Sequence, residues 1–215
     1  MTNAREQILQ RIRRANRDRS DVLTQDTLQQ RMQQHTRGPQ PQWSEDILTR
    51  FMQKAEQSAA SVSKIGQGEE IVNAVMRYLE EHQLGNTLLS ANLLPISDLI
   101  WPATIAVEKR AATQDDKVVL TQAYCAVAET GSVVMVSSHD TPVSLNFLPD
   151  HFLCLVDADS IVNTIEDVWQ KMRDEDLPMP RALNFVTGPS RTADVEQIIQ
   201  MGAHGPRKVH LLLMS

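Results

Sequence analysis

The sequence predicts an α/β domain in which helices flank a mostly parallel sheet, with a helical arm in front of it. Short apolar, β-prone segments alternate with amphipathic helical segments from residue 44 onward. A Gly38-Pro39-Gln40-Pro41 turn separates that pattern from two more polar helical segments. A chain of 215 residues can bury a sizeable core without disulfides or metals. We therefore expect a helical arm and hinge over residues 1–41 and one α/β domain over residues 42–215.

The arm is predicted to contain a helix over Thr2–Asn16 and a weaker, glutamine-rich helix over Asp21–Gln34. The first has a narrow apolar face at helical spacing, formed by Ile8, Leu9, Ile12 and Ala15. Its arginines form a basic cluster that we interpret as a solvated helix face. Arms of this kind cover a partner or a neighbouring subunit, or remain mobile.

The first half of the main domain alternates regularly. Ser44 is a candidate cap for a helix with an apolar face from Ile47 to Ala55. The amphipathic segment Glu69–His82 predicts a second helix, with Gly85 just past its end. The remaining predicted elements are strands at Ser61–Ile65, Thr87–Leu89, Thr104–Val107 and Val118–Leu120, and a helical turn at Ile96–Ile100.

The second half departs from this alternation. Ala126–Ser137 has two β-prone halves that meet at a Glu129-Thr130-Gly131 turn or bulge. Phe152–Val156 predicts a strand. The following helix is expected to bury one apolar stripe and to end before Pro178 and Pro180; the stripe comprises Ile161, Val162, Ile165, Val168 and Trp169.

The C-terminal segment is predicted to run strand, turn, helix, turn, strand. Leu183–Val186 is β-prone and Gly188-Pro189 interrupts it. Ser190 or Thr192 is expected to cap a helix that carries Asp194 and Glu196 in its first turn. Gly202 would end that helix, and Val209–Met214 predicts a buried strand.

Composition excludes several classes of protein. A net charge of −6 spread along the chain argues against nucleic-acid binding. Cys125 and Cys154 are the only cysteines, so this chain cannot hold an iron–sulfur cluster in the usual four-cysteine way. The histidines lack metal-ligand spacing, and no nucleotide-binding glycine motif is complete. With no signal peptide or membrane span expected, we predict a cytoplasmic protein.

The candidate site follows from the rule that ligands gather at the carboxyl ends of parallel strands. Glu129 and Arg191 both follow predicted strands. Glu129 can serve as a base, as a nucleophile, or as an acceptor for backbone amides across the bulge. Arg191 can hold a small anion beside a helix N-terminus, or pair with Asp194. His151 precedes its strand, so its place depends on the local connection.

Three sequence blocks also carry a family resemblance. Residues 188–197, GPSRTADVEQ, and residues 202–206, GAHGP, resemble the C-terminal signature of the LutC/YkgG lactate-utilisation proteins, the LUD-domain family. Residues 128–132, AETGS, and residues 148–151, LPDH, resemble two further blocks of that family. Together they cover roughly the C-terminal half in the correct order. The resemblance implies the fold shared by NagB, RpiA and the CoA transferases.

The resemblance also implies a function. A LutC-type subunit works with iron–sulfur LutA-like and LutB-like partners in oxidising L-lactate to pyruvate, and carries no cofactor itself. We expect either a small-anion-binding or assembly subunit, whose anion site or helical arm engages the partner proteins, or an enzyme acting on a small carboxylate or acyl compound through Glu129. The anion would be a small carboxylate or another small anion. The candidate ligand-binding residues are Gly131, His151, Gly188, Ser190, Arg191, Thr192, Asp194 and His204.

Overall fold

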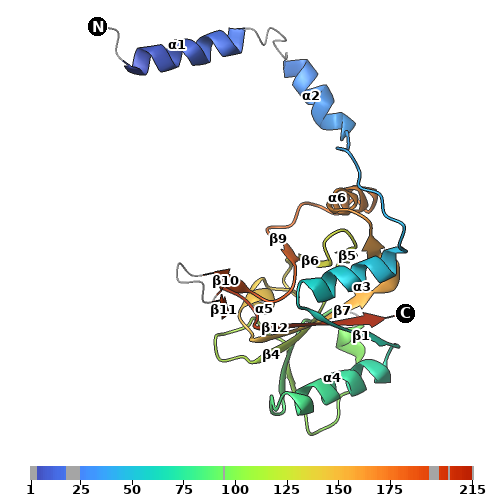
Figure 1. Cartoon of the computed structure of the whole chain (residues 1–215). Helices are drawn as coiled ribbons and strands as arrows, with labels where there is room; N and C mark the ends of the chain where they lie inside the picture. The colour runs from blue at the N-terminus through green and yellow to red at the C-terminus, as the bar shows by residue number, and fades with distance from the viewer. Residues whose placement is uncertain (1–3, 18–24, 94, 194–198, 203, 215) are drawn as a thin grey trace. The chain divides into compact units, whose positions relative to one another are not determined.

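The computed structural model describes residues 4–17, 25–93, 95–193, 199–202 and 204–214 (Figure 1). The chain divides into two compact units, Met1–Pro41 and Gln42–Ser215. Among the described residues, no helix combines the length and the apolar character needed to cross a lipid bilayer.

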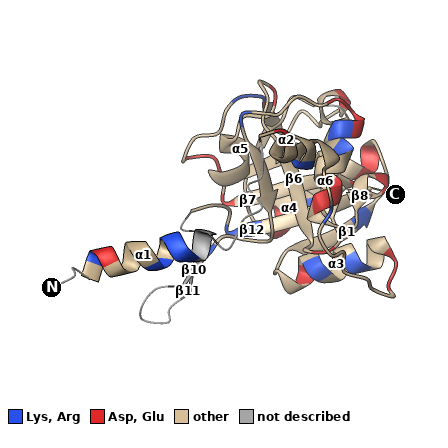
Figure 2. Ribbon diagram, turned by 90° about the horizontal axis from the view of Figure 1, so that it is seen from above, with Lys and Arg blue, Asp and Glu red and all other residues tan. Residues whose placement is uncertain are grey.

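The N-terminal unit contains helices α1 (Ala4–Arg17) and α2 (Gln25–Gln34). On α1, Ile8 and Ile12 lie one turn apart and are 59% and 51% exposed. Most of the charged residues of α1 are basic, and an acidic residue lies in its first turn (Figure 2). The predicted helical pattern of the arm is therefore present, and Ile8, Leu9 and Ile12 of its apolar face are exposed.

A six-stranded parallel sheet forms the centre of the second unit. Its strand order is β1-β12-β7-β4-β2-β3, and every neighbouring pair is parallel. This confirms the predicted fold class. The strands are β1 (Ser61–Ile65), β2 (Thr87–Ser90), β3 (Ala106–Glu108), β4 (Val118–Gln122), β7 (His151–Asp157) and β12 (Lys208–Met214).

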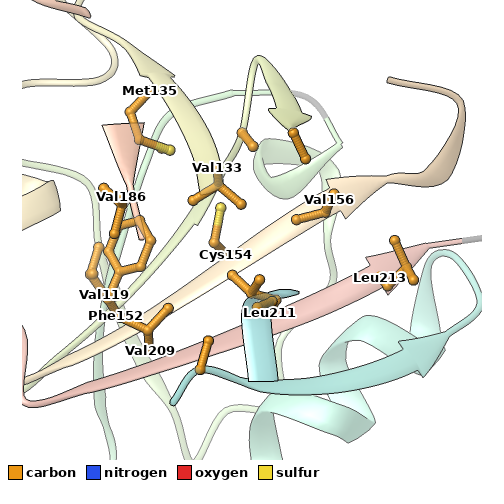
Figure 3. Close-up of a cluster of buried hydrophobic side chains, with 14 of the residues drawn as sticks. Val119, Val133, Met135, Phe152, Cys154, Val156, Val186, Val209, Leu211 and Leu213 are labelled. Carbon is orange, nitrogen blue, oxygen red and sulfur yellow. The ribbon is translucent and has the colours of Figure 1, made fainter. Parts of the chain in front are cut away.

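The central strands are apolar on both faces because both faces are covered. On β7, Leu153 and Leu155 point to the face covered by α4 (Glu69–Glu81). Phe152, Cys154 and Val156 point to the opposite face, where they meet α3 (Ile47–Gln57) and a second sheet. Figure 3 shows this second cluster, in which side chains of β7 and β12 meet Val133, Met135 and Val186 of the second sheet.

The second sheet has four strands in the order β8-β5-β6-β9. Strands β5 (Cys125–Val127) and β6 (Ser132–Val136) form the hairpin around the predicted Glu129 turn, and β9 (Leu183–Val186) pairs antiparallel with β6. Helix α6 (Ile165–Asp174) contributes Val168 and Met172 to an apolar cluster with β5 and β6. The short elements α5, η1 and η2 span Ser144–Phe147, Ile96–Asp98 and Ala158–Ser160.

The start of the helix before Pro178 was predicted wrongly. Ile161 and Val162 form the short strand β8, parallel to β5, rather than part of the helical stripe. The helix begins at Ile165 because Thr164 and Asp167 form a capping box there. Asp167 Oδ2 accepts hydrogen bonds from the Thr164 amide at 2.8 Å and from its hydroxyl at 2.9 Å.

The helix predicted after Ser190 is also wrong. The segment forms an antiparallel hairpin of β10 (Arg191–Ala193) and β11 (Ile199–Met201), in which Thr192 pairs with Gln200. Neither Ser190 nor Thr192 therefore caps a helix. The β-branched side chains of this stretch, from Thr192 to Ile199, favour strands.

Candidate functional site

Gly131 and Gly188, one from each of two signature blocks, pack against the end of α3. Both have positive φ, at 70° and 71°. A Cβ on Gly131 would overlap the Ala55 backbone nitrogen, and one on Gly188 would overlap the Ser58 carbonyl oxygen. Only glycine allows the two turns to approach α3 this closely.

A chain of hydroxyl groups joins these two turns. Thr130 Oγ1 lies 2.7 Å from Ser132 Oγ, which lies 2.6 Å from Thr187 Oγ1. Ser132 is buried, and the chain links the start of β6 to the residue after β9. The hydroxyls therefore satisfy one another at a buried junction.

Glu129 lies at the start of α6. Its backbone amide donates to the Asn163 carbonyl at 2.9 Å, and its Oε2 accepts a hydrogen bond from the Ile165 amide at 3.3 Å. Ile165 is the first residue of α6. The carboxylate therefore satisfies a free amide at the positive end of that helix.

The C-terminal signature residues lie at the base of the β10–β11 hairpin. The Ser190 amide donates to the Pro206 carbonyl at 2.9 Å, and the Gly202 amide donates to the Ser190 carbonyl at 3.0 Å. Arg191 and His204 are exposed. Asp194 and the side chain of Thr192 fall outside the described residues. Within the described part of the chain, no hydrogen bond or ion pair joins Glu129 to Arg191.

A cavity of about 450 Å³ lies at the carboxyl ends of β2 and β3. We call it the carboxyl-edge cavity. This edge of a parallel sheet is where ligands bind in α/β proteins. The lining residues are Ser90, Asn92, Lys109, Arg110, Ala111, His139, Asp140 and Pro142.

Sequence reasoning missed this cavity, although a signal for it was present. Ser90 ends β2 and Lys109 directly follows β3, as Glu129 follows β5. The rule that singled out Glu129 applied equally to these strands. The loop that contributes His139 and Asp140 follows β6, a strand of the other sheet, and only the folded arrangement brings it here.

Some of the charged side chains that line the carboxyl-edge cavity already have protein partners, and others could bind a ligand. Arg110 is held by Asp116 through two hydrogen bonds of 2.7 Å and by Glu108 at 2.8 Å. These bonds with Arg110 lower the pKa of the Asp116 carboxyl. Asp140 accepts from the Asn92 amide at 3.1 Å, and this bond and His139 lower its pKa. Lys109 has no ion pair within the described residues, so it is the cation available to an anionic ligand.

His151 belongs to a different group, at the amino ends of β7 and β12. Its Nδ1 lies 3.0 Å from the Tyr78 hydroxyl of α4. The Tyr78 ring also stacks on His210 at 4.9 Å between ring centroids and meets His82 edge-on at 4.2 Å. We call Tyr78, His82, His151, Lys208 and His210 the amino-edge cluster.

Burial shifts the pKa values of three side chains in this cluster toward their uncharged forms. Desolvation and the charges of His82 and Lys208 lower the pKa of His151 to about 4. Desolvation and His82 lower the pKa of His210 to about 4 as well. Desolvation raises the pKa of Tyr78 to about 12. Among the described residues, no group of three or more His, Cys, Asp or Glu is arranged to hold a metal ion.

Comparison with known proteins places this arrangement in a family. The model of the LUD domain family matches residues 48–214, and the chain belongs to that family. A crystal structure of a DUF162 family protein from Deinococcus radiodurans superposes with a TM-score of 0.60 over 81% of this chain and all of that one. At 19% sequence identity, this likeness supports the fold alone.

Curated relatives match half of the chain or more. Lactate utilization protein C of Bacillus subtilis (strain 168) is 31% identical over 118 residues, which are 54% of this chain and 49% of that protein. The protein YkgG of Escherichia coli (strain K12) is 26% identical over 180 residues, 80% of this chain and 76% of YkgG. Lactate utilization protein C of Anoxybacillus flavithermus is 28% identical over 116 residues, 54% of this chain and 52% of that protein. The chain thus spans about half the length of the lactate utilization proteins it matches.

Proposed function

We propose that this LUD-family protein serves lactate utilisation by binding a small carboxylate in the carboxyl-edge cavity. The observation that carries the proposal is Lys109, a cation with no ion pair among the described residues, in a cavity at the ligand-binding edge of a parallel sheet. The relatives named lactate utilization protein C supply the physiological context. Iron–sulfur partner proteins of the LutA and LutB kind would carry the electrons.

The cavity suits a small anion better than a large ligand. Its two other charged groups, Arg110 and Asp140, are engaged with protein partners, so one free ammonium remains for one carboxylate. The Ser90 hydroxyl donates to the Ala91 carbonyl at 3.0 Å, which leaves its oxygen lone pairs rather than its proton available. The Lys109 ammonium would therefore hold the ligand chiefly through its charge, and the other polar side chains of the cavity would add weaker contacts.

Replacing Lys109 by alanine should weaken carboxylate binding severalfold, because an ion pair with an exposed ammonium contributes about 0.2 to 1 kcal/mol. Titration calorimetry of the purified chain with L-lactate and with pyruvate measures this directly. Lys64→Ala is the matched control, since Lys64 is an exposed lysine on β1 that does not line the cavity. Equal affinity in wild type and Lys109→Ala would refute the site.

The physiological part of the proposal is tested in a bacterium that grows on L-lactate. Its lactate-utilisation subunit is deleted and replaced by this chain, by Lys109→Ala or by Lys64→Ala, and the level of folded protein is measured in each strain. Growth restored by wild type and Lys64→Ala, but not by Lys109→Ala, is expected. Growth restored equally by all three would argue against a role for the cavity.

Replacing Glu129 by glutamine should leave growth intact and lower the free energy of unfolding by less than about 1 kcal/mol. A glutamine oxygen can still accept the hydrogen bond from the Ile165 amide, so the start of α6 is retained. Chemical denaturation and the same growth assay check this. If the folded variant fails to support growth, Glu129 acts chemically, as an enzyme of the CoA-transferase-like fold would require.

A further inference from the structure

The amino-edge cluster lies at the opposite ends of the strands from the proposed ligand cavity. It joins three elements: α4 supplies Tyr78 and His82, β7 begins with His151, and β12 supplies Lys208 and His210. Ser61 of β1 adjoins it, with its Oγ 2.7 Å from His210 Nδ1. Lys208 is the register partner of His151 across the β7–β12 pair. The proposed function uses none of these side chains.

We propose that the amino-edge cluster is a proton-sensitive latch, which holds the base of the β10–β11 hairpin closed at neutral pH and releases it on acidification. The inference is independent of the proposed carboxylate site. It rests on the bonds that the three imidazoles make, on the charges around them, and on the connection between the cluster and the hairpin.

Proton uptake at His82 is incompatible with its bond to Lys208. Lys208 Nζ lies 3.4 Å from His82 Nδ1, and an ammonium group can only donate. An imidazolium carries protons on both nitrogens, so a protonated His82 presents a second donor and the bond is lost. A protonated His151 Nδ1 can only donate, so the Tyr78 hydroxyl would have to turn from donor to acceptor.

The surrounding charges add to this effect. His82 and His151 lie 5.3 Å apart between ring centroids, and Lys208 adds a further positive charge to the same place. The carboxylates that face the cluster are Glu81 on α4 and Asp150 before β7. Asp150 Oδ1 is already engaged by Arg207 Nε at 3.1 Å. Charge on the three histidines is therefore only partly compensated.

Backbone hydrogen bonds connect the cluster to the hairpin. The amides of Arg207 and Lys208 both donate to the Asp150 carbonyl, at 2.8 and 3.0 Å. Pro206, the residue before them, accepts from the Ser190 amide, and Ser190 accepts from Gly202. The Arg207 side chain also lies against Gly202, where a Cβ would overlap its Cγ. Separation of the first residues of β7 and β12 therefore loosens both ends of the hairpin.

Hydrogen exchange of the full chain, read by mass spectrometry at pH 7.5, 6.0 and 5.0, tests the latch. After correction for the intrinsic rate at each pH, protection of peptides containing Ser190 and residues 206–210 should fall tenfold or more by pH 5.0. Peptides from the β5–β6 hairpin should lose clearly less protection over the same pH range. Unchanged protection at Ser190, or an equal loss across β5 and β6, would overturn the proposal.

Single substitutions distinguish a pH response caused by the amino-edge cluster from a general loss of stability in acid. His82→Gln removes the charge that faces both other histidines, so the loss of protection at Ser190 should shrink severalfold. Lys208→Gln removes the ammonium and should act in the same direction, which guards against a folding defect in one variant. His35→Gln is the control, since His35 is exposed and belongs to the N-terminal unit rather than to the cluster. A response in both cluster variants equal to that of His35→Gln would contradict the latch.

Discussion

Replacing Gly188 by alanine is expected to lower the free energy of unfolding by about 2 to 5 kcal/mol. The new methyl group would overlap the Ser58 carbonyl oxygen, a backbone atom that cannot turn aside as a flexible side chain can. Overpacking costs about 1 to 3 kcal/mol, and the left-handed backbone at φ 71° adds about 1 to 2 kcal/mol for a residue with a Cβ. Gly131→Ala should behave alike, since its Cβ would overlap the backbone of Ala55.

Thermal and chemical unfolding measure this effect. At about 2 to 4 °C per kcal/mol for a domain of this size, the midpoint should fall by roughly 10 °C. Gly85→Ala is a close control, because Gly85 has φ 77° but a Cβ there would have no heavy atom within 4 Å. Gly85→Ala should lower the free energy of unfolding only by the strain of a left-handed backbone, about 1 to 2 kcal/mol. If Gly188→Ala and Gly85→Ala lose the same stability, the contact with α3 does not matter.

Acidification from pH 7 to 4 is expected to lower the free energy of unfolding by about 2 to 4 kcal/mol through His151 and His210. Both have a pKa of about 4 in the folded chain, against about 6.5 when unfolded. Between those values the unfolded chain binds more protons, so stability falls as the pH falls. Each pKa unit corresponds to about 1.4 kcal/mol, and partial exposure of both rings reduces the total.

Denaturant unfolding at half-unit pH intervals gives this profile. His210→Gln removes one of the two groups and should roughly halve the slope between pH 6.5 and 4, and His35→Gln, in the N-terminal unit, is the control. Carboxylates with lowered pKa values, such as Asp116, lose their contribution only near and below pH 4, so they do not account for the earlier part of the window. A flat profile between pH 6.5 and 4.5 would contradict the assignment.

The candidate site was predictable only in part, because local pattern does not report which distant segments meet. The turn at Glu129 and the glycines at 131 and 188 were recognisable as tight turns. That both turns rest on the end of α3 depends on packing between segments that are about 75 and 130 residues apart. His151 was recognised alone, whereas His82 and His210 join it through α4 and β12.

The sequence by itself determined the parallel α/β core, because buried strands such as Phe152–Val156 and Val209–Met214 are apolar on both faces and tolerate no other environment. It also determined helices such as Glu69–Glu81, whose apolar residues repeat over several turns. Only the tertiary structure decided that Ile161–Val162 and Arg191–Ala193 are strands. Such short segments differ by less than about 1 kcal/mol per residue between helix and strand, so the contacts made after folding outweigh the local preference.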